Sequence, residues 1–329
     1  MLRLQTCGRF LMRATGVAPM QGRIHRQSLA TLTRSSIAWR HLRDWKQTCA
    51  CRNAAVASLA LLPAAFTFSH SSLQRPASSV ACEPVQDSSL VIVVGVSYEP
   101  GIGFAVAKRF AAEGMKVGMI GRQASRLTAA SASIKDSIPG ACVDTSVADA
   151  TNPEEIKVAI AGFEKKHGPC KVLIYNVSAR PFPPQEVADC PPERFVEHFN
   201  SNVMGALHCV QAVVPQMRET KAGTIIFTGA SASWRGTAKF GFFGAAKMSL
   251  RSMAQSLAKE LNPLGIHVAH VVIDGMVDMP VIHQFVGKPP GRMIDTDAIA
   301  DAYWMLHCQK PHCFTFEIDV RPNAASWAI

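Results

Sequence analysis

The segment that most constrains this chain is a glycine-rich turn between an apolar run and a helical stretch. Residues 90–95 read Leu-Val-Ile-Val-Val-Gly, which predicts a buried strand, and residues 102–114 predict a helix. Gly95, Gly101 and Gly103 lie in or beside the turn that joins them. Glycine allows the backbone angles of such a turn and lets a phosphate approach the amides at the helix start. As the first unit of an α/β domain, the segment predicts a dinucleotide site, with an ordinary strand-to-helix turn as the alternative.

Short β-rich runs and helical stretches alternate along the chain after residue 86. The predicted strands are residues 90–95, 116–121, 141–146, 171–176, 223–229, 267–273 and 314–320. The predicted helices are residues 102–114, 123–135, 152–167, 192–219, 239–262 and 295–306. This alternation favours right-handed crossovers and a parallel sheet covered on both faces. We therefore predict that residues 86–329 form a single α/β domain: a doubly wound, Rossmann-like sheet of about seven strands with helices on both faces.

The excess positive charge of the chain lies entirely in its N-terminal part. Residues 1–82 contain ten Arg, one Lys and one acidic residue, whereas the rest carries 23 basic and 23 acidic residues. The predicted domain has no basic surplus to bind a phosphate backbone, so we expect no nucleic-acid partner. Residues 1–85 are rich in Arg, Ser, Thr and Ala, which predicts an organelle-targeting leader, removed or disordered in the mature protein. Our interpretation is a mitochondrial protein, with a plastid protein as the alternative.

A nearly uncharged apolar stretch at residues 54–68 complicates this leader. It contains 15 residues, whereas a membrane-spanning helix needs roughly 20. We favour a simple leader that is removed. The alternative is a two-part leader or anchor that sorts the protein to an inner membrane or a lumen, with residues 78–81 as a small-residue cleavage region. We expect membrane contact only if residues 54–68 are retained.

Two His and two Cys within residues 307–313 are the one grouping in the predicted domain that suggests a metal. Their spacing matches no closed zinc module, and Pro311 lies among them. We therefore expect a surface turn here and no metal site, with zinc as the alternative.

The glycine turn resembles that of the short-chain dehydrogenase/reductase family. It departs from the usual family motif because Gly101 lies six positions after Gly95, where the family has four. The longer turn is similar to that of the enoyl-reductase branch. The resemblance implies that a nicotinamide dinucleotide is bound by the following residues of the turn: Gly95, Ser97, Tyr98, Gly101, Ile102 and Gly103.

Three positions outside the turn also bear on the cofactor. The second predicted strand ends at Gly121-Arg122, with no acid to pair with a ribose 2′-hydroxyl. Arg122 is instead placed to meet a 2′-phosphate, so we predict NADP(H) in preference to NAD(H); a solvated Arg122 is the alternative. Asp149 matches the family Asp that lies near the adenine ring. Asn176 matches an Asn of the family's fourth-strand segment.

The family's active site is a tetrad of Asn, Ser, Tyr and Lys, in which Tyr transfers the proton and Lys lowers its pKa. Asn202 and Lys247 match two members, and Lys247 would also bind the nicotinamide ribose. The Tyr position, four residues before Lys247, is Phe243, which cannot transfer a proton. The Ser position is Ala230, and a shift of one residue would bring in Ser231. The candidate catalytic residues are therefore Asn202, Lys247 and Ser231.

Three functions follow from this incomplete tetrad. We favour an NAD(P)(H)-dependent oxidoreductase with a non-standard proton donor, which transfers hydride to or from a small apolar or acyl-bearing substrate. The apolar segment 275–292, expected as a mobile lid, suggests that substrate class. An enoyl- or dienoyl-thioester reductase is one alternative, and a catalytically inactive dinucleotide-binding pseudoenzyme is another. The resemblance also implies a homodimer or homotetramer formed through the predicted helices 192–219 and 239–262.

Overall fold

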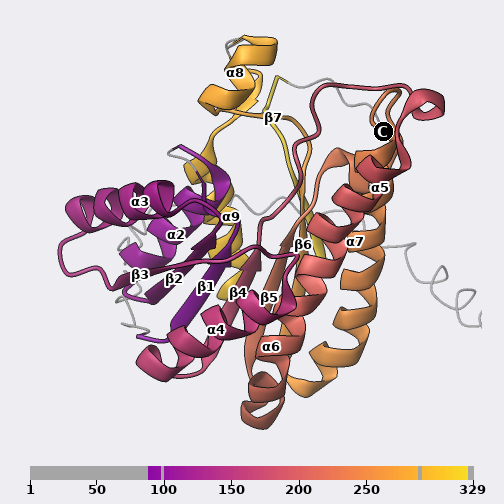
Figure 1. Cartoon of the computed structure of the whole chain (residues 1–329). Helices are drawn as coiled ribbons and strands as arrows, with labels where there is room; N and C mark the ends of the chain where they lie inside the picture. The colour runs from indigo at the N-terminus through magenta and orange to yellow at the C-terminus, as the bar shows by residue number, and fades with distance from the viewer. Residues whose placement is uncertain (1–87, 98–99, 288–290, 325–329) are drawn as a thin grey trace, which may run out of the picture. The chain divides into compact units, whose positions relative to one another are not determined.

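The computed structural model describes residues 88–97, 100–287 and 291–324 (Figure 1). Every described residue belongs to one compact unit within Ser78–Ile329. The predicted leader at 1–85 and Tyr98 therefore lie outside the described residues. No helix within the described part of the chain has the length and apolar character needed to cross a membrane.

Seven parallel strands form the main sheet, in the order β3-β2-β1-β4-β5-β6-β9. The strands are β1 (Leu90–Val94), β2 (Lys116–Gly121), β3 (Val143–Val147), β4 (Cys170–Tyr175), β5 (Gly223–Thr228), β6 (Ile266–Ile273) and β9 (Glu317–Val320). The order reverses between β1 and β4, which makes that pair the topological switch point where doubly wound sheets bind ligands. The predicted seven-stranded, doubly wound fold is confirmed.

Helices cover both faces of the sheet (Figure 1). One face carries α2 (Ile102–Ala112), α3 (Ala124–Ser137) and α9 (Thr296–His307), and the other carries α4 (Pro153–His167), α6 (Gly205–Thr220) and α7 (Gly241–Leu261). Successive strand residues point to opposite faces. In β1, Val91 and Val93 pack under α2, whereas Leu90 and Ile92 pack in the cluster with α4 and α6. Both faces of β1 are therefore buried, which explains its unbroken apolar run.

The predicted helix 192–219 contains a π turn. Its residues form α5 (Pro192–Phe199), a π-helical turn η2 (Asn200–Met204) and α6. A π turn inserts an extra residue into the helix and often occurs at functional sites. The predicted helical stretch is confirmed, and the π turn inside it is a local feature that the apolar spacing does not reveal. Asn202 lies in the π turn.

Helix α4 begins at a side-chain cap, Asn152. The side chain of Asn152 accepts hydrogen bonds from the amides of Glu154 (3.1 Å) and Glu155 (3.3 Å), and Pro153 occupies the first helical position. This cap satisfies two of the amides that a helix start leaves unpaired. The predicted boundary at residue 152 is therefore confirmed by a physical cap.

The long connection after β6 contains a short helix. Two-residue strands β7 (Met276–Val277) and β8 (Met293–Ile294) pair in parallel and flank α8 (Pro280–Val286). In Figure 1, α8 lies above the sheet and away from the other labelled helices. The sequence analysis expects an apolar, mobile lid at residues 275–292, and the structure has the short helix α8 within this segment.

Candidate cofactor and substrate site

A cavity of about 490 Å³ lies at the carboxyl ends of β1, β4 and β5. Its wall combines the glycine turn, the first residues after three strands, one turn of α7 and the apolar side of α8. The sequence-predicted residues that line it are Gly95, Ser97, Gly101, Ile102, Gly103, Arg122, Asn176 and Lys247. The cavity thus brings together predicted site residues from four separate parts of the chain.

The glycine turn has the close backbone packing that a bound diphosphate requires. Gly95 has a φ of +100°, and a Cβ built there would lie 2.7 Å from the backbone of Asn176. A Cβ on Gly103 would lie 2.7 Å from the carbonyl oxygen of Gly95. Helix α2 begins after Gly101, which offers no side-chain cap to its first amides. A cradle without side chains that faces uncapped amides fits a diphosphate group.

Asn176 ties the end of β4 to this turn. Its Nδ2 donates a hydrogen bond of 3.2 Å to the oxygen of Gly95, and its backbone amide donates one of 2.8 Å to Val94. Asn176 therefore holds the turn in position and also lines the cavity.

Arg122 marks one end of the cavity, after β2. Its guanidinium is 74% exposed and lies 3.7 Å from a carboxylate oxygen of Asp149. Burial raises the pKa of Asp149, but hydrogen bonds from Thr151 and the charge of Arg122 outweigh it and hold that pKa below its usual value. Asp149 lines a smaller adjoining cavity of about 160 Å³. Arg126, in the first turn of α3, also lines the main cavity.

Lys247 is buried in the wall of the cavity, where 3% of its surface is exposed. Its Nζ donates a hydrogen bond of 2.8 Å to the backbone oxygen of Thr228. Burial lowers the pKa of Lys247 to about 7. An amine with this pKa exchanges its proton readily near neutral pH.

Phe243 and Ala230 line the cavity beside Lys247. They are the residues at which the sequence resemblance implies Tyr and Ser. No tyrosine of the described residues lines the cavity. Tyr175 donates to the backbone oxygen of Ser201 (2.5 Å), and the hydroxyl of Tyr303 lies 2.7 Å from Thr228 Oγ1. Within the described part of the chain, the cavity wall therefore contains no phenol.

The other two candidate catalytic residues do not line the cavity. Ser231 begins the short 3-10 turn η3 (Ser231–Ser233), next to Ala230. Asn202 is fully buried in η2, where its Nδ2 donates 2.9 Å to the backbone oxygen of His198. Its Oδ1 has no hydrogen-bond partner. Neither residue makes a direct polar contact with Lys247.

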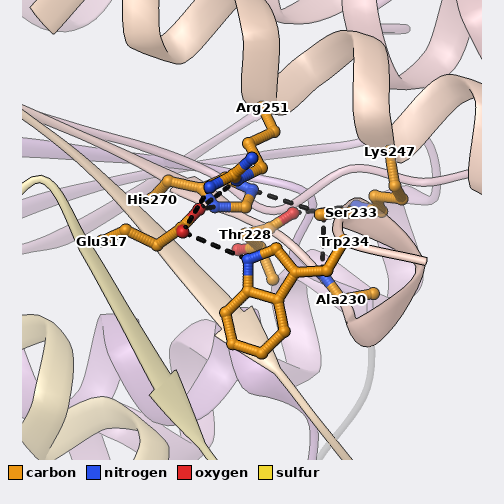
Figure 2. Close-up of polar contacts among 8 residues, drawn as sticks. All are labelled: Thr228, Ala230, Ser233, Trp234, Lys247, Arg251, His270 and Glu317. Carbon is orange, nitrogen blue, oxygen red and sulfur yellow. Dashed lines mark hydrogen bonds and ion pairs between the residues drawn. The ribbon is translucent and has the colours of Figure 1, made fainter. Parts of the chain in front are cut away.

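A hydrogen-bond network behind the wall fixes the backbone near Ala230 (Figure 2). Glu317 accepts from Arg251 (2.6 and 2.8 Å), from Trp234 Nε1 (3.1 Å) and from His270 Nδ1 (2.9 Å). The other ring nitrogen of His270 lies 3.5 Å from Ser233 Oγ, which accepts from the Ala230 amide (3.2 Å). Burial lowers the pKa of His270 to about 4, so the ring is neutral at pH 7. This network was missed from the sequence because its members are far apart along the chain.

One group of side chains in the described residues has the spacing of a metal site: Cys142, Asp144 and His167. None of them lines the cavity, and Asp144 is paired with Lys166 at 2.6 Å. The predicted turn at 307–313 contains a short 3-10 turn, η5 (Pro311–Cys313).

The sheet order and the cavity at its switch point define the class of protein, a dinucleotide-binding α/β protein. The family model of short chain dehydrogenases matches residues 89–286. An uncharacterized oxidoreductase of Staphylococcus saprophyticus is 30% identical over 233 residues, which cover 71% of this chain and 97% of that protein. The chain therefore belongs to the short-chain dehydrogenase/reductase family, whose members are NAD(P)-dependent oxidoreductases.

Two further relatives have informative names. A short-chain dehydrogenase from Rhodopseudomonas palustris of known structure is 32% identical, with a TM-score of 0.61 over 71% of this chain and 99% of that chain. A 3-oxoacyl-acyl-carrier-protein reductase of Mycobacterium avium is 30% identical over 197 residues, 59% of this chain and 69% of that protein. Both similarities agree with the α/β fold of the described residues.

Proposed function

We propose that this protein is an NADP(H)-dependent oxidoreductase that acts on a small apolar or acyl-bearing substrate and takes its proton from a source other than tyrosine. One observation carries the proposal: a buried lysine with a near-neutral pKa, Lys247, lines the cavity beside Phe243 and Ala230. The described residues of the glycine turn fit a diphosphate, and the position at which the resemblance implies a tyrosine holds Phe243, whose ring cannot exchange a proton.

The residues of the cavity fit a phosphorylated nicotinamide dinucleotide. The glycine turn would hold the diphosphate, Lys247 the nicotinamide ribose, and Arg122 with Arg126 the 2′-phosphate. Arg122 and Arg126 line that end of the cavity, with Asp149 3.7 Å from Arg122, and the two cations support NADP(H) over NAD(H). The bound nicotinamide supplies or takes the hydride.

Lys247 is the proton donor that the described geometry offers to a substrate oxygen. One of its three hydrogens bonds to Thr228, which leaves two for other partners. General acids act best when their pKa lies near the working pH, and the pKa of Lys247 is about 7. Lys247 can therefore protonate the oxygen of a carbonyl substrate in the direction of reduction and accept the proton in the reverse direction.

The substrate half of the cavity is apolar. Met279, Val281, Ile282 and Phe285 line it from α8 and the residue before it, and Phe182 stacks on Phe285 with the ring centroids 4.7 Å apart. Side chains of this kind suit an acyl chain. The Mycobacterium avium relative, named as a 3-oxoacyl reductase, supports an acyl-bearing substrate.

Association through α5 and α7 is also part of the proposal, as a homodimer or homotetramer. Val196 (56% exposed) and Phe199 (42% exposed) on α5 and Met248 (38% exposed) on α7 leave apolar surface on these helices. Sedimentation analysis distinguishes a dimer or tetramer from a monomer.

The experiment titrates the purified protein with NADPH and NADH by cofactor fluorescence, then measures NADPH oxidation with 3-oxoacyl and trans-2-enoyl thioesters. The proposal expects tighter NADPH binding and turnover of a 3-oxoacyl substrate. Turnover of the enoyl substrate alone would favour the enoyl-thioester reductase.

Lys247→Met should abolish turnover, whereas Lys239→Met, at an exposed site, should not. Cofactor binding without turnover of either substrate would indicate a pseudoenzyme.

A further inference from the structure

Three side chains at the edge of the sheet form a chain of contacts: a thiol, an imidazole and a carboxylate. Cys142 comes directly before β3, Asp144 lies within β3, and His167 is the last residue of α4. The Sγ atom of Cys142 lies 4.0 Å from Nδ1 of His167, and Nε2 of the same ring lies 2.5 Å from Oδ2 of Asp144. The imidazole therefore lies between the thiol and the carboxylate and contacts each with a different nitrogen.

This group is separate from the cavity. Strand β3 forms one edge of the seven-stranded sheet (Figure 1), and Cys142 precedes its first residue. The cavity lies at the opposite, carboxyl ends of the parallel strands, and its wall contains none of the three side chains. Chemistry at this group is therefore independent of the proposed function.

The thiol of Cys142 is free and exposed. The sheet holds its backbone, because the amide of Val117 donates a hydrogen bond of 2.8 Å to the Cys142 oxygen. By contrast, burial raises the pKa of the Cys170 and Cys209 thiols, which keeps both protonated. Cys142 thus combines access from solvent with a neighbouring imidazole.

Asp144 determines which nitrogen of the neutral His167 ring carries the hydrogen. Burial raises the pKa of Asp144, but hydrogen bonds from Lys166 and His167 outweigh it and hold that pKa below its usual value. The charged carboxylate accepts from Nε2, which leaves the lone pair of Nδ1 on the side of Cys142. Only 6% of the His167 side chain is exposed, which restricts rotation of the ring. The ring is therefore placed as a base for the thiol, and Asp144 stabilises the imidazolium that forms.

Lys166 adds a positive charge to the group. Its Nζ lies 2.6 Å from Oδ2 of Asp144, and this hydrogen bond raises the pKa of Lys166; the charge of a Cys142 thiolate raises it further. The attraction acts on both partners, so the ammonium also favours the thiolate. The thiolate is the nucleophilic form of cysteine, and neighbouring Lys and His side chains favour it.

We propose that Cys142 is a modification site, at which the thiol reacts with low-molecular-weight disulfides and becomes a mixed disulfide. A nucleophile, a base and a third group that orients the base are the parts that this reaction needs. The contact of 4.0 Å between Cys142 and His167 is long, as such contacts often are before the reagent binds. Cys142 is the reacting residue, His167 is its base, and Asp144 positions the base.

The step is a thiol–disulfide exchange. The proton of the Cys142 thiol moves to Nδ1 of His167, and the Sγ atom attacks one sulfur of the disulfide. A new sulfur–sulfur bond forms while the bond of the reagent breaks. The second sulfur leaves with the electron pair of that bond and takes the proton from the His167 imidazolium. Cys142 is oxidised, and the reagent disulfide is reduced to one thiol and one half of the mixed disulfide.

The first test measures the reaction of each cysteine of the full-length protein with oxidised glutathione. The reduced protein is incubated with the reagent at pH 7, and mass spectrometry quantifies the modified peptides at successive times. A thiol without a base is only a few per cent ionised at this pH. Cys142 should therefore react about tenfold faster than Cys313, an exposed thiol outside the group. In urea the two rates should become similar, because unfolding separates the three side chains.

The second test removes the base. His167→Gln retains a donor for Asp144 but has no imidazole nitrogen to accept the proton, so it should lower the rate at Cys142 about tenfold. Asp144→Asn should lower the rate less, because the ring remains and only its orientation is lost. Lys165→Gln, on the same turn of α4 but outside the group, is the matched control and should leave the rate unchanged. A constant rate at Cys313 in all three variants separates loss of the base from a general loosening of the fold.

Equal rates at Cys142 and Cys313 in the wild-type protein would overturn the proposal without any variant. Zinc that is purified with the protein and lost in Cys142→Ser would also overturn it, because a thiolate bound to a metal makes the group a metal site. A protein that reacts first at Cys142 but reduces no substrate would overturn the proposed function alone. The two proposals can therefore fail separately.

Discussion

The Nζ atom of Lys247 lies 5.9 Å from the ring centroid of Phe243, one helical turn earlier on α7, and both side chains line one cavity. A phenol on the ring of residue 243 would lie in the field of the Lys247 ammonium, which favours its ionised form. Phe243→Tyr should therefore raise the rate of carbonyl reduction by about 100-fold, the lower end of what a general acid contributes. Steady-state kinetics with a 3-oxoacyl thioester measures the gain.

Phe240→Tyr is the control for that gain, because Phe240 lies three residues away and does not line the cavity. Adding Ala230→Ser to Phe243→Tyr should raise the rate further, since the network at Glu317 already holds the backbone of residue 230. A Phe243→Tyr variant no faster than wild type would show that the site no longer has the geometry that proton transfer from a tyrosine requires.

The selectivity for NADPH should depend on Arg122. Its guanidinium is mostly exposed, so a contact with a 2′-phosphate is screened and modest. Arg122→Gln should weaken NADPH binding about tenfold, the equivalent of ~1.4 kcal/mol, and leave NADH binding within about twofold. Fluorescence titration at two salt concentrations measures both. Equal losses for the two cofactors would assign Arg122 a structural role with Asp149.

The burial of Lys247 should make stability depend on pH. Its pKa is about 7 in the folded protein, whereas a lysine side chain in water has a pKa of 10.5. Between these values the unfolded chain binds one more proton than the folded protein, so the free energy of unfolding rises with pH by ~1.4 kcal/mol per unit. Below pH 7 both states are protonated and this contribution is constant. In urea denaturation, Lys247→Met should lose that slope relative to wild type, and parallel pH curves would contradict the burial of the charged group.

Much of the fold was predictable because its signals are local. The apolar run of β1, the glycine turn and the cap at Asn152 each lie within a few consecutive residues, and each corresponds to the observed element. The position of Lys247 four residues after Phe243 likewise indicated one helical face. These features depend on backbone preferences and hydrogen bonds that close within one or two turns.

The features of the fold and the site that the sequence did not predict depend on contacts between residues that are far apart along the chain. Glu317 lies 66 positions from Arg251 and 83 from Trp234, and no spacing rule connects them. No sequence signal marks the π turn that holds Asn202.

Glu317 should contribute to stability through the network in Figure 2. Burial raises its pKa, but hydrogen bonds from Arg251, Trp234 and His270 outweigh it, so the net pKa is below 4.5. Its stabilising effect is therefore present above the unfolded pKa and is lost as pH falls through the folded one. Glu317→Gln should lower the free energy of unfolding by roughly 2 kcal/mol at neutral pH and reduce the loss of stability in acid. Glu186→Gln, at an exposed ion pair with Lys239, should change it by less than about 0.5 kcal/mol.

We propose that residues 1–85 direct the protein to mitochondria. Cationic, acid-poor segments of this composition are read by organelle import systems. A fusion of residues 1–85 to a fluorescent protein should enter mitochondria, and replacing its arginines by glutamine should leave the fusion in the cytosol. Carbonate extraction of the organelle then tests the stretch at 54–68: release into the soluble fraction indicates a removed leader, and retention in the membrane indicates an anchor. Entry of the fusion into plastids would contradict the mitochondrial assignment, and a fusion that stays cytosolic would contradict the leader itself.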